Sequence, residues 1–202
     1  MLSILHAAGW PIWTIVVASI ISLAIIIERL FALRRARIAP TLLLNDTVAR
    51  YRREGASSSL IAQLAQGSPL AQVFSAGIKN VTHSRDIMKE AIEEAGRAVT
   101  VELDRYLTTL GTIAAMAPLL GLLGTVIGMI DIFGAQGPQG SDPQQLAHGI
   151  SIALYNTAFG LIVAIPSMIF YRYFRAKADA LLITMEQEAI KLVELIHGER
   201  DA

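Results

Sequence analysis

Three stretches of the chain carry no charged side chain and are long enough to cross a lipid bilayer as helices. They are residues 10–27, 107–130 and 149–171. A membrane-spanning helix needs about 20 consecutive apolar residues. Short apolar runs also occur as buried helices of soluble proteins, but three such runs in a chain of 202 residues favour membrane spans. The pattern therefore predicts an all-α integral membrane protein with three transmembrane helices.

The first span is predicted to be a retained helix and not a cleaved signal peptide. Residues 1–9 contain no Lys or Arg, and no Ala-x-Ala-like cleavage site follows the run. The run ends at Glu28 and Arg29, and further arginines follow, which is typical of a stop-transfer sequence. Trp10 and Trp13 lie at its other end, where aromatic residues anchor spans at the membrane surface.

Basic residues predict the orientation of the spans. Arginines and lysines follow the first and third spans, at 29–37 and 172–177, whereas 1–9 and 131–148 contain none. Because basic flanks stay in the cytoplasm, we expect the C-terminus inside and the N-terminus outside. The expected organisation is 1–27 with the first span, a helical cytoplasmic loop 28–106, a span 107–130, an outer loop 131–148, a span 149–171 and a cytoplasmic helix 172–202.

The cytoplasmic parts are expected to extend the spans as long helices. Ser68-Pro69 is typical of a helix start. From Ser84 onward, apolar or small residues recur at helical spacing up to Leu110, which predicts one long helix running into the second span. This stripe is either a coiled-coil or partner-docking face, or a face packed on the chain's own loop helices. The tail after Ala176 is an amphipathic helix expected to pack beside the others.

Composition and motifs exclude most enzymes. The 17 Lys+Arg balance the 17 Asp+Glu, so no basic excess indicates nucleic-acid binding. The absence of cysteine excludes disulfides, iron–sulfur clusters and thiolate zinc sites. The four histidines form no metal-binding pair, and the glycine run of the second span lacks the lysine of a phosphate-binding loop. We expect no enzymatic activity, no cofactor and no metal.

Small residues define one narrow face on each of the second and third spans. Such faces let membrane helices approach closely, so they serve either as packing surfaces or as the lining of a pore. Depth along the spans favours a role for one residue of each face: Thr125 and Thr157 lie roughly 9 and 12 Å from the outer surface at ~1.5 Å per residue. The two faces comprise Gly111, Pro118, Gly121, Thr125 and Gly128 in the second span, and Ala153, Thr157, Gly160, Ala164 and Ser167 in the third.

No span contains Asp, Glu, Lys, Arg or His. Proteins that carry protons across lipid normally use an ionisable relay inside the membrane. Hydroxyl groups pass protons along hydrogen bonds but cannot hold a charge. If the chain conducts protons, the titrating group must therefore belong to another chain.

Two segments resemble the MotA/TolQ/ExbB proton-channel family, and within it the ExbB branch is the most similar. One is Ala117-Pro118…Gly121…Gly124-Thr125…Gly128, and the other runs from Gly149 to Pro166 as GISIALYNTAFGLIVAIP. The three spans and the large cytoplasmic loop also agree with that family. Many ExbB and TolQ sequences carry a glutamate five residues before the threonine of the third span, whereas this chain has Ile152.

The resemblance implies a ring of five copies in a bacterial inner membrane, with N-termini in the periplasm. It implies that the ring encloses a dimeric, single-span ExbD- or TolR-like partner whose aspartate titrates, and that proton flow drives a TonB- or TolA-like protein. It assigns Thr125 and Thr157 to the proton pathway. Asp131 is a candidate acid at the outer mouth, although its position favours a solvated charge at a helix end.

Two other functions remain open on the sequence. In a purely structural membrane scaffold, the small faces would only pack helices and no ion would move. A small secondary transporter is the third hypothesis, but the missing intramembrane charge and the lack of inverted repeats argue against it.

Overall fold

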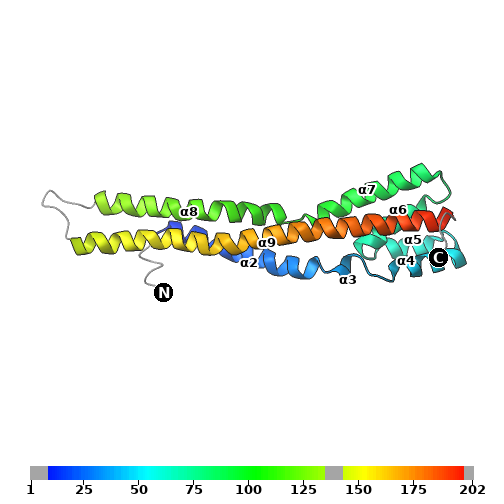
Figure 1. The fold of residues 1–202 in the computed structure, drawn as a ribbon, viewed down its shortest axis with the longest axis horizontal. Helices are drawn as coiled ribbons and strands as arrows, with labels where there is room; N and C mark the ends of the chain where they lie inside the picture. The colour runs from blue at the N-terminus through cyan, green and yellow to red at the C-terminus, as the bar shows by residue number, and fades with distance from the viewer. Residues whose placement is uncertain (1–8, 135–142, 198–202) are drawn as a thin grey trace. The chain divides into compact units, whose positions relative to one another are not determined.

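The computed structural model describes residues 9–134 and 143–197, and all regular structure in these ranges is helical. The sequence prediction of an all-α fold is confirmed. In chain order the helices are α2 (Pro11–Ala32), α3 (Arg35–Ile38), α4 (Leu43–Glu54), α5 (Ser58–Ala65), α6 (Pro69–Lys79), α7 (Arg85–Leu103), α8 (Leu107–Gly134) and α9 (Pro143–His197), as Figure 1 shows.

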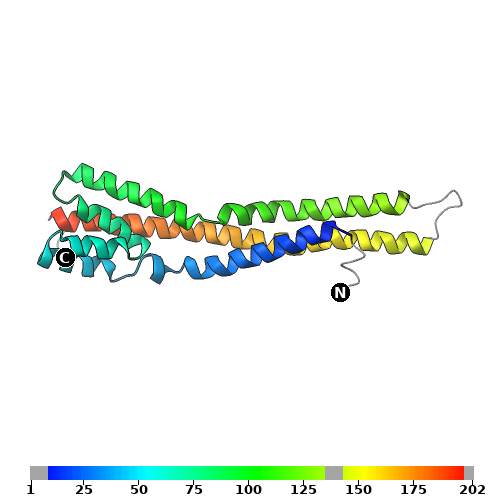
Figure 2. The same cartoon turned by 180° about the vertical axis from the view of Figure 1, so that it is seen from behind.

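The chain divides into two compact units. The first comprises Met1–Glu28 and Tyr106–Tyr173, and the second comprises Arg29–Arg105 and Phe174–Ala202. The first unit holds most of α2, all of α8 and the first part of α9; Figures 1 and 2 show α8 beside this part of α9. The second unit holds α3 to α7 and the last part of α9.

Three helical segments are long and apolar enough to cross a membrane, as predicted. They are Pro11–Ala32 and the apolar parts of Arg85–Gly134 and Leu146–His197. Many large apolar side chains on them remain exposed, for example Ile20 at 64% and Ile162 at 63%. Such surfaces suit contact with lipid or with other membrane helices.

The predicted helix from Ser84 into the second span is interrupted. α7 ends at Leu103, α8 begins at Leu107, and Tyr106 between them has a φ of 62°, in the left-handed region. Within the second unit, Arg29 reaches the end of α7, where its Nη1 donates to the carbonyl oxygens of Glu102 (3.3 Å) and Leu103 (3.2 Å). These bonds satisfy carbonyls that an unbroken helix would have used itself.

The second unit has its own core. Two of its short helices, α5 and α6, begin where a serine side chain accepts a backbone N–H bond: Ser57 from Leu60 and Ser68 from Ala71. The predicted start at Ser68-Pro69 is therefore confirmed. The amphipathic tail also packs as predicted, but it continues the third span in one helix of 55 residues. The buried residues of the tail include Leu181, Met185, Ala189, Leu192 and Val193. The core of the second unit also contains Phe74 and Ile78 of α6 and Met88 of α7.

The helices on either side of the predicted outer loop extend further than expected. α8 continues to Gly134, and α9 begins at Pro143, a residue suited to a first helical turn. Of the predicted loop 131–148, the remaining residues 135–142 lie outside the described part of the chain, as do residues 1–8 at the N-terminus.

Candidate functional site

The structure brings the two predicted threonines together across α8 and α9. Thr125 Oγ1 and Thr157 Oγ1 are 2.5 Å apart, a hydrogen bond in which either hydroxyl can be the donor. Thr125 Oγ1 also lies 3.2 Å from the carbonyl oxygen of Gly121 and 3.1 Å from that of Ala153. Since a hydroxyl has one proton and two lone pairs, these contacts are alternatives between which the proton of Thr125 can switch.

Glycines allow this close contact between the two backbones. A Cβ on Gly160 would lie 2.5 Å from the carbonyl oxygen of Ala117, and a Cβ on Gly121 would lie 2.7 Å from that of Asn156. Both glycines are buried. Only a residue without a side chain fits at either position, and the two positions flank the threonine pair along α9 and α8.

The other small residues extend the contact in both directions. A Cβ on Gly128 would lie 3.1 Å from the Cβ of Ala153, which is 1% exposed, and Ala164 is buried. At the opposite end, a Cβ on Gly111 would lie 3.1 Å from the nearest ring atom of Tyr171. Pro118 is half-buried within α8. The small faces thus pack against each other inside one chain.

Asn156 also belongs to this contact. Its side chain is 0% exposed. It fills the space beside Gly124, where an added Cβ would meet the Asn156 side chain at 2.8 Å. The neighbouring Tyr155 is 42% exposed and faces away. Asn156 lies four residues before Gly160, so its place on the small face of α9 could have indicated this burial.

Asp131 and Ile152 stand apart from the threonine pair. Asp131 is exposed near the end of α8, and no ion pair is found for it among the described residues. Ile152 is half-buried and precedes Ala153 on α9. The structure therefore supplies no carboxylate beside the threonines within the described part of the chain.

A second pair of hydroxyls joins α2 to α9. Ser22 Oγ and Ser167 Oγ are 2.6 Å apart, and both side chains are buried. Ser167 Oγ also donates to the carbonyl oxygen of Val163 at 2.7 Å, close to Pro166 within α9. The sequence placed Ser167 on the small face of the third span but gave no signal for its partner.

Comparison with known proteins gives consistent matches. The model of the MotA/TolQ/ExbB proton channel family matches residues 65–187, more than half of the chain. The putative biopolymer transport protein ExbB-like 3 of Synechocystis sp. is 31% identical over 163 residues, covering 78% of this chain and 77% of that protein. The Tol-Pal system protein TolQ of Pseudomonas aeruginosa is 32% identical over 186 residues, covering 84% and 78%.

A solved structure shares the fold. The flagellar MotAB stator complex from Bacillus subtilis contains a chain that superposes with a TM-score of 0.63 at 18% identity. The superposition covers 94% of this chain and 78% of that chain.

Proposed function

This chain belongs to the MotA/TolQ/ExbB proton channel family, and on that premise we propose that it is the ring subunit of a proton-driven motor in a bacterial inner membrane. Five copies surround a dimeric single-span partner of the ExbD or TolR type, and the complex drives a TonB- or TolA-like protein. The chain itself performs no enzymatic step and holds no cofactor. Its N-terminus is periplasmic and its C-terminus cytoplasmic, in line with the basic residues at 29–37 and 172–177.

The observation that carries this proposal is the hydroxyl pair of Thr125 and Thr157, 2.5 Å apart in spans free of Asp, Glu, Lys, Arg and His. Paired hydroxyls relay a proton by exchanging hydrogen bonds but cannot store it as a charge. A carboxylate from the partner accepts the proton, and the threonines deliver or remove it. One charge crossing 100 mV releases about 2.3 kcal/mol, enough to change a few side-chain contacts.

The test is proton flux in vesicles that contain the chain with its co-encoded partner. Thr157→Val keeps the shape of the side chain and removes the hydroxyl, so partner-dependent flux should fall to the level of vesicles without the partner. Thr157→Ser keeps the hydroxyl and should retain most of the flux. Unchanged flux in Thr157→Val, or rapid flux through the chain alone, would contradict the proposal.

The alternative is a non-conducting scaffold. The observation that favours it is the close packing at Gly121 and Gly160 within one chain. A scaffold requires the glycines but not the hydroxyl pair. It therefore predicts that Thr157→Val behaves like the parent protein in the flux assay, and that the natural partner has no acidic residue within the membrane.

A further inference from the structure

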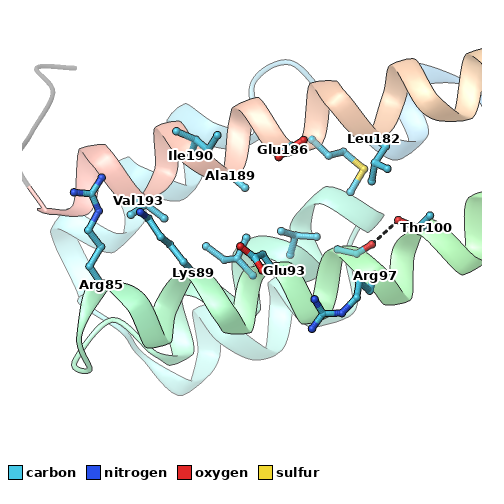
Figure 3. Close-up of a pocket in the computed structure, with 14 residues that line it drawn as sticks. Arg85, Lys89, Glu93, Arg97, Thr100, Leu182, Glu186, Ala189, Ile190 and Val193 are labelled. Carbon is cyan, nitrogen blue, oxygen red and sulfur yellow. Dashed lines mark hydrogen bonds between the residues drawn. The ribbon is translucent and has the colours of Figure 1, made fainter.

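The second unit contains a groove of about 540 Å³ between α7 and the last part of α9. Val73 of α6 lines it, and Leu182, Met185 and Ile190 of α9 make one wall apolar. The α7 wall carries three cations, Arg85, Lys89 and Arg97, with one carboxylate, Glu93, among them; Glu186 lies on the α9 side. Figure 3 shows Arg85 and Lys89 extending from α7 toward α9. We call this region the cationic groove.

The groove has both exposed apolar surface and two cations that form no ion pair with the described residues. Ile190 is 52% exposed although it lines the groove. Lys89 and Arg97 form no ion pair among the described residues. A Cβ on Gly96, another lining residue, would meet nothing within 4 Å. Space, exposed apolar surface and unmatched positive charge thus lie together.

The opposite face of α7 is also left uncovered. Its residues follow the alternating spacing of four and three that is typical of coiled-coil contacts. Two of the large ones, Ile87 and Val101, are 45% and 74% exposed. Lipid does not cover them, because charged residues lie at the flanking positions. This face, the α7 seam, consists of Ile87, Ala91, Glu94, Ala98 and Val101; Asp86, Glu90 and Glu102 lie beside it, and Arg97 lies at its edge toward the groove.

The two surfaces are complementary, and one copy presents both. The α7 seam combines four apolar residues with Glu94 and three flanking carboxylates, whereas the cationic groove combines an apolar wall with three cations and two carboxylates. Lys89 and Ile87 are two residues apart on α7, which places them about 200° apart around the helix. A copy that receives a neighbour in its groove therefore keeps its own seam available for the next copy.

We propose that the α7 seam of one copy docks at the cationic groove of the next copy, with Glu90 and Glu94 facing the cations Lys89 and Arg97 and Ile87 near Ile190. Such a contact joins two different surfaces, and repeated head-to-tail contacts of this kind close into a ring. The inference rests on the proposed ring and identifies the surfaces that join its copies outside the membrane.

Because the chain contains no cysteine, a disulfide between two copies can form only through introduced cysteines. The variants are Ile87→Cys, Ile190→Cys and the double variant, each expressed at full length with the partner and oxidised in membranes. The double variant should form a ladder of covalent oligomers. Each single variant expressed alone should give no covalent oligomer. The two single variants expressed together should give covalent dimers and nothing larger.

Charge reversal provides a second measurement. Glu90→Lys combined with Glu94→Lys should reduce the cross-linking yield several-fold. Adding Lys89→Glu and Arg97→Glu to the same chain should restore it, because every interface then carries the swapped charges. A variant pair that unfolds the unit would not be rescued in this way.

Three outcomes would overturn the inference. Cross-linking of either single variant alone would mean that like surfaces meet. No ladder from the double variant, in a sample that elutes as an oligomer and still conducts protons with the partner, would place the contact elsewhere and leave the proposed function intact. Cross-linking of Ile87→Cys to the partner alone would mean that the partner occupies the seam. If the unsubstituted protein with its partner conducts no protons, the proposed function itself is wrong.

Discussion

Replacing Gly160 by alanine tests the contact on which the threonine pair depends. The added Cβ would lie 2.5 Å from the carbonyl oxygen of Ala117 and 3.1 Å from the Cα of Gly121. The first distance is about 1 Å inside the optimal separation of roughly 3.5 Å between non-bonded heavy atoms. Both neighbouring atoms belong to backbone, so no side chain can rotate away, and α8 and α9 must separate.

The expected cost combines two opposing effects. Overpacking a tight contact costs about 1–3 kcal/mol, while alanine is better than glycine inside a helix by up to about 1 kcal/mol. We expect a net loss of about 1–2 kcal/mol in the free energy of unfolding. For a chain of this length, each kcal/mol lowers Tm by about 2–4 °C. Partner-dependent proton flux should fall as well, because Thr157 lies one turn away on α9.

Two other glycines provide matched controls in the same thermal-unfolding assay. Gly96→Ala has open space around its Cβ and should raise stability by up to about 1 kcal/mol. The added Cβ of Gly128→Ala would lie 3.1 Å from the Cβ and 3.5 Å from the Cα of Ala153, so this variant should fall between the two. If Gly160→Ala unfolds at the same temperature as Gly96→Ala or above it, α8 and α9 do not make the contact described.

Further predictions concern two polar contacts. Arg29→Gln should lower the free energy of unfolding by about 2–3 kcal/mol, because hydrogen bonds to a charged donor are among the stronger ones. The carbonyl oxygens at the end of α7 would lose this partner. Arg34→Gln, at an exposed position, is the control in the same unfolding assay. Ser22→Ala and Ser167→Ala should show a coupling of only about 0.6 kcal/mol in a double-mutant cycle, and a coupling above 2 kcal/mol would contradict that estimate.

The sequence predicted those features that depend on long, uniform patterns. The charge-free runs are long enough to identify all three spans. The local signal of Ser68 followed by proline identified a helix start, because the cap is formed by the serine itself. The depth estimate placed Thr125 and Thr157 at similar levels, and their hydrogen bond agrees with this placement. A regular rise per residue is all that this estimate requires.

Features that depend on distant residues were not predictable in this way. The break between α7 and α8 has no glycine or proline to mark it. It is stabilised by Arg29, more than 70 positions earlier in the chain, and by Arg175, which forms a 2.7 Å ion pair with Asp104. Helical periodicity continues through such a break, so the pattern alone predicts an uninterrupted helix. The same limit applies to the bond between Ser22 and Ser167.

The packing and pore interpretations of the small faces are compatible because of the geometry of α8 and α9. Threonine side chains are short, so their hydroxyls can meet across two helices only if the backbones approach closely. Gly121 and Gly160 permit that approach, since their missing side chains leave room for backbone atoms of the other helix. The glycines therefore act as packing residues in every model, and in a proton channel they also position the hydroxyl pair. A defect in Gly160→Ala alone cannot separate the two models, whereas Thr157→Val with Thr157→Ser can, because that comparison changes the hydroxyl and leaves the helix contact in place.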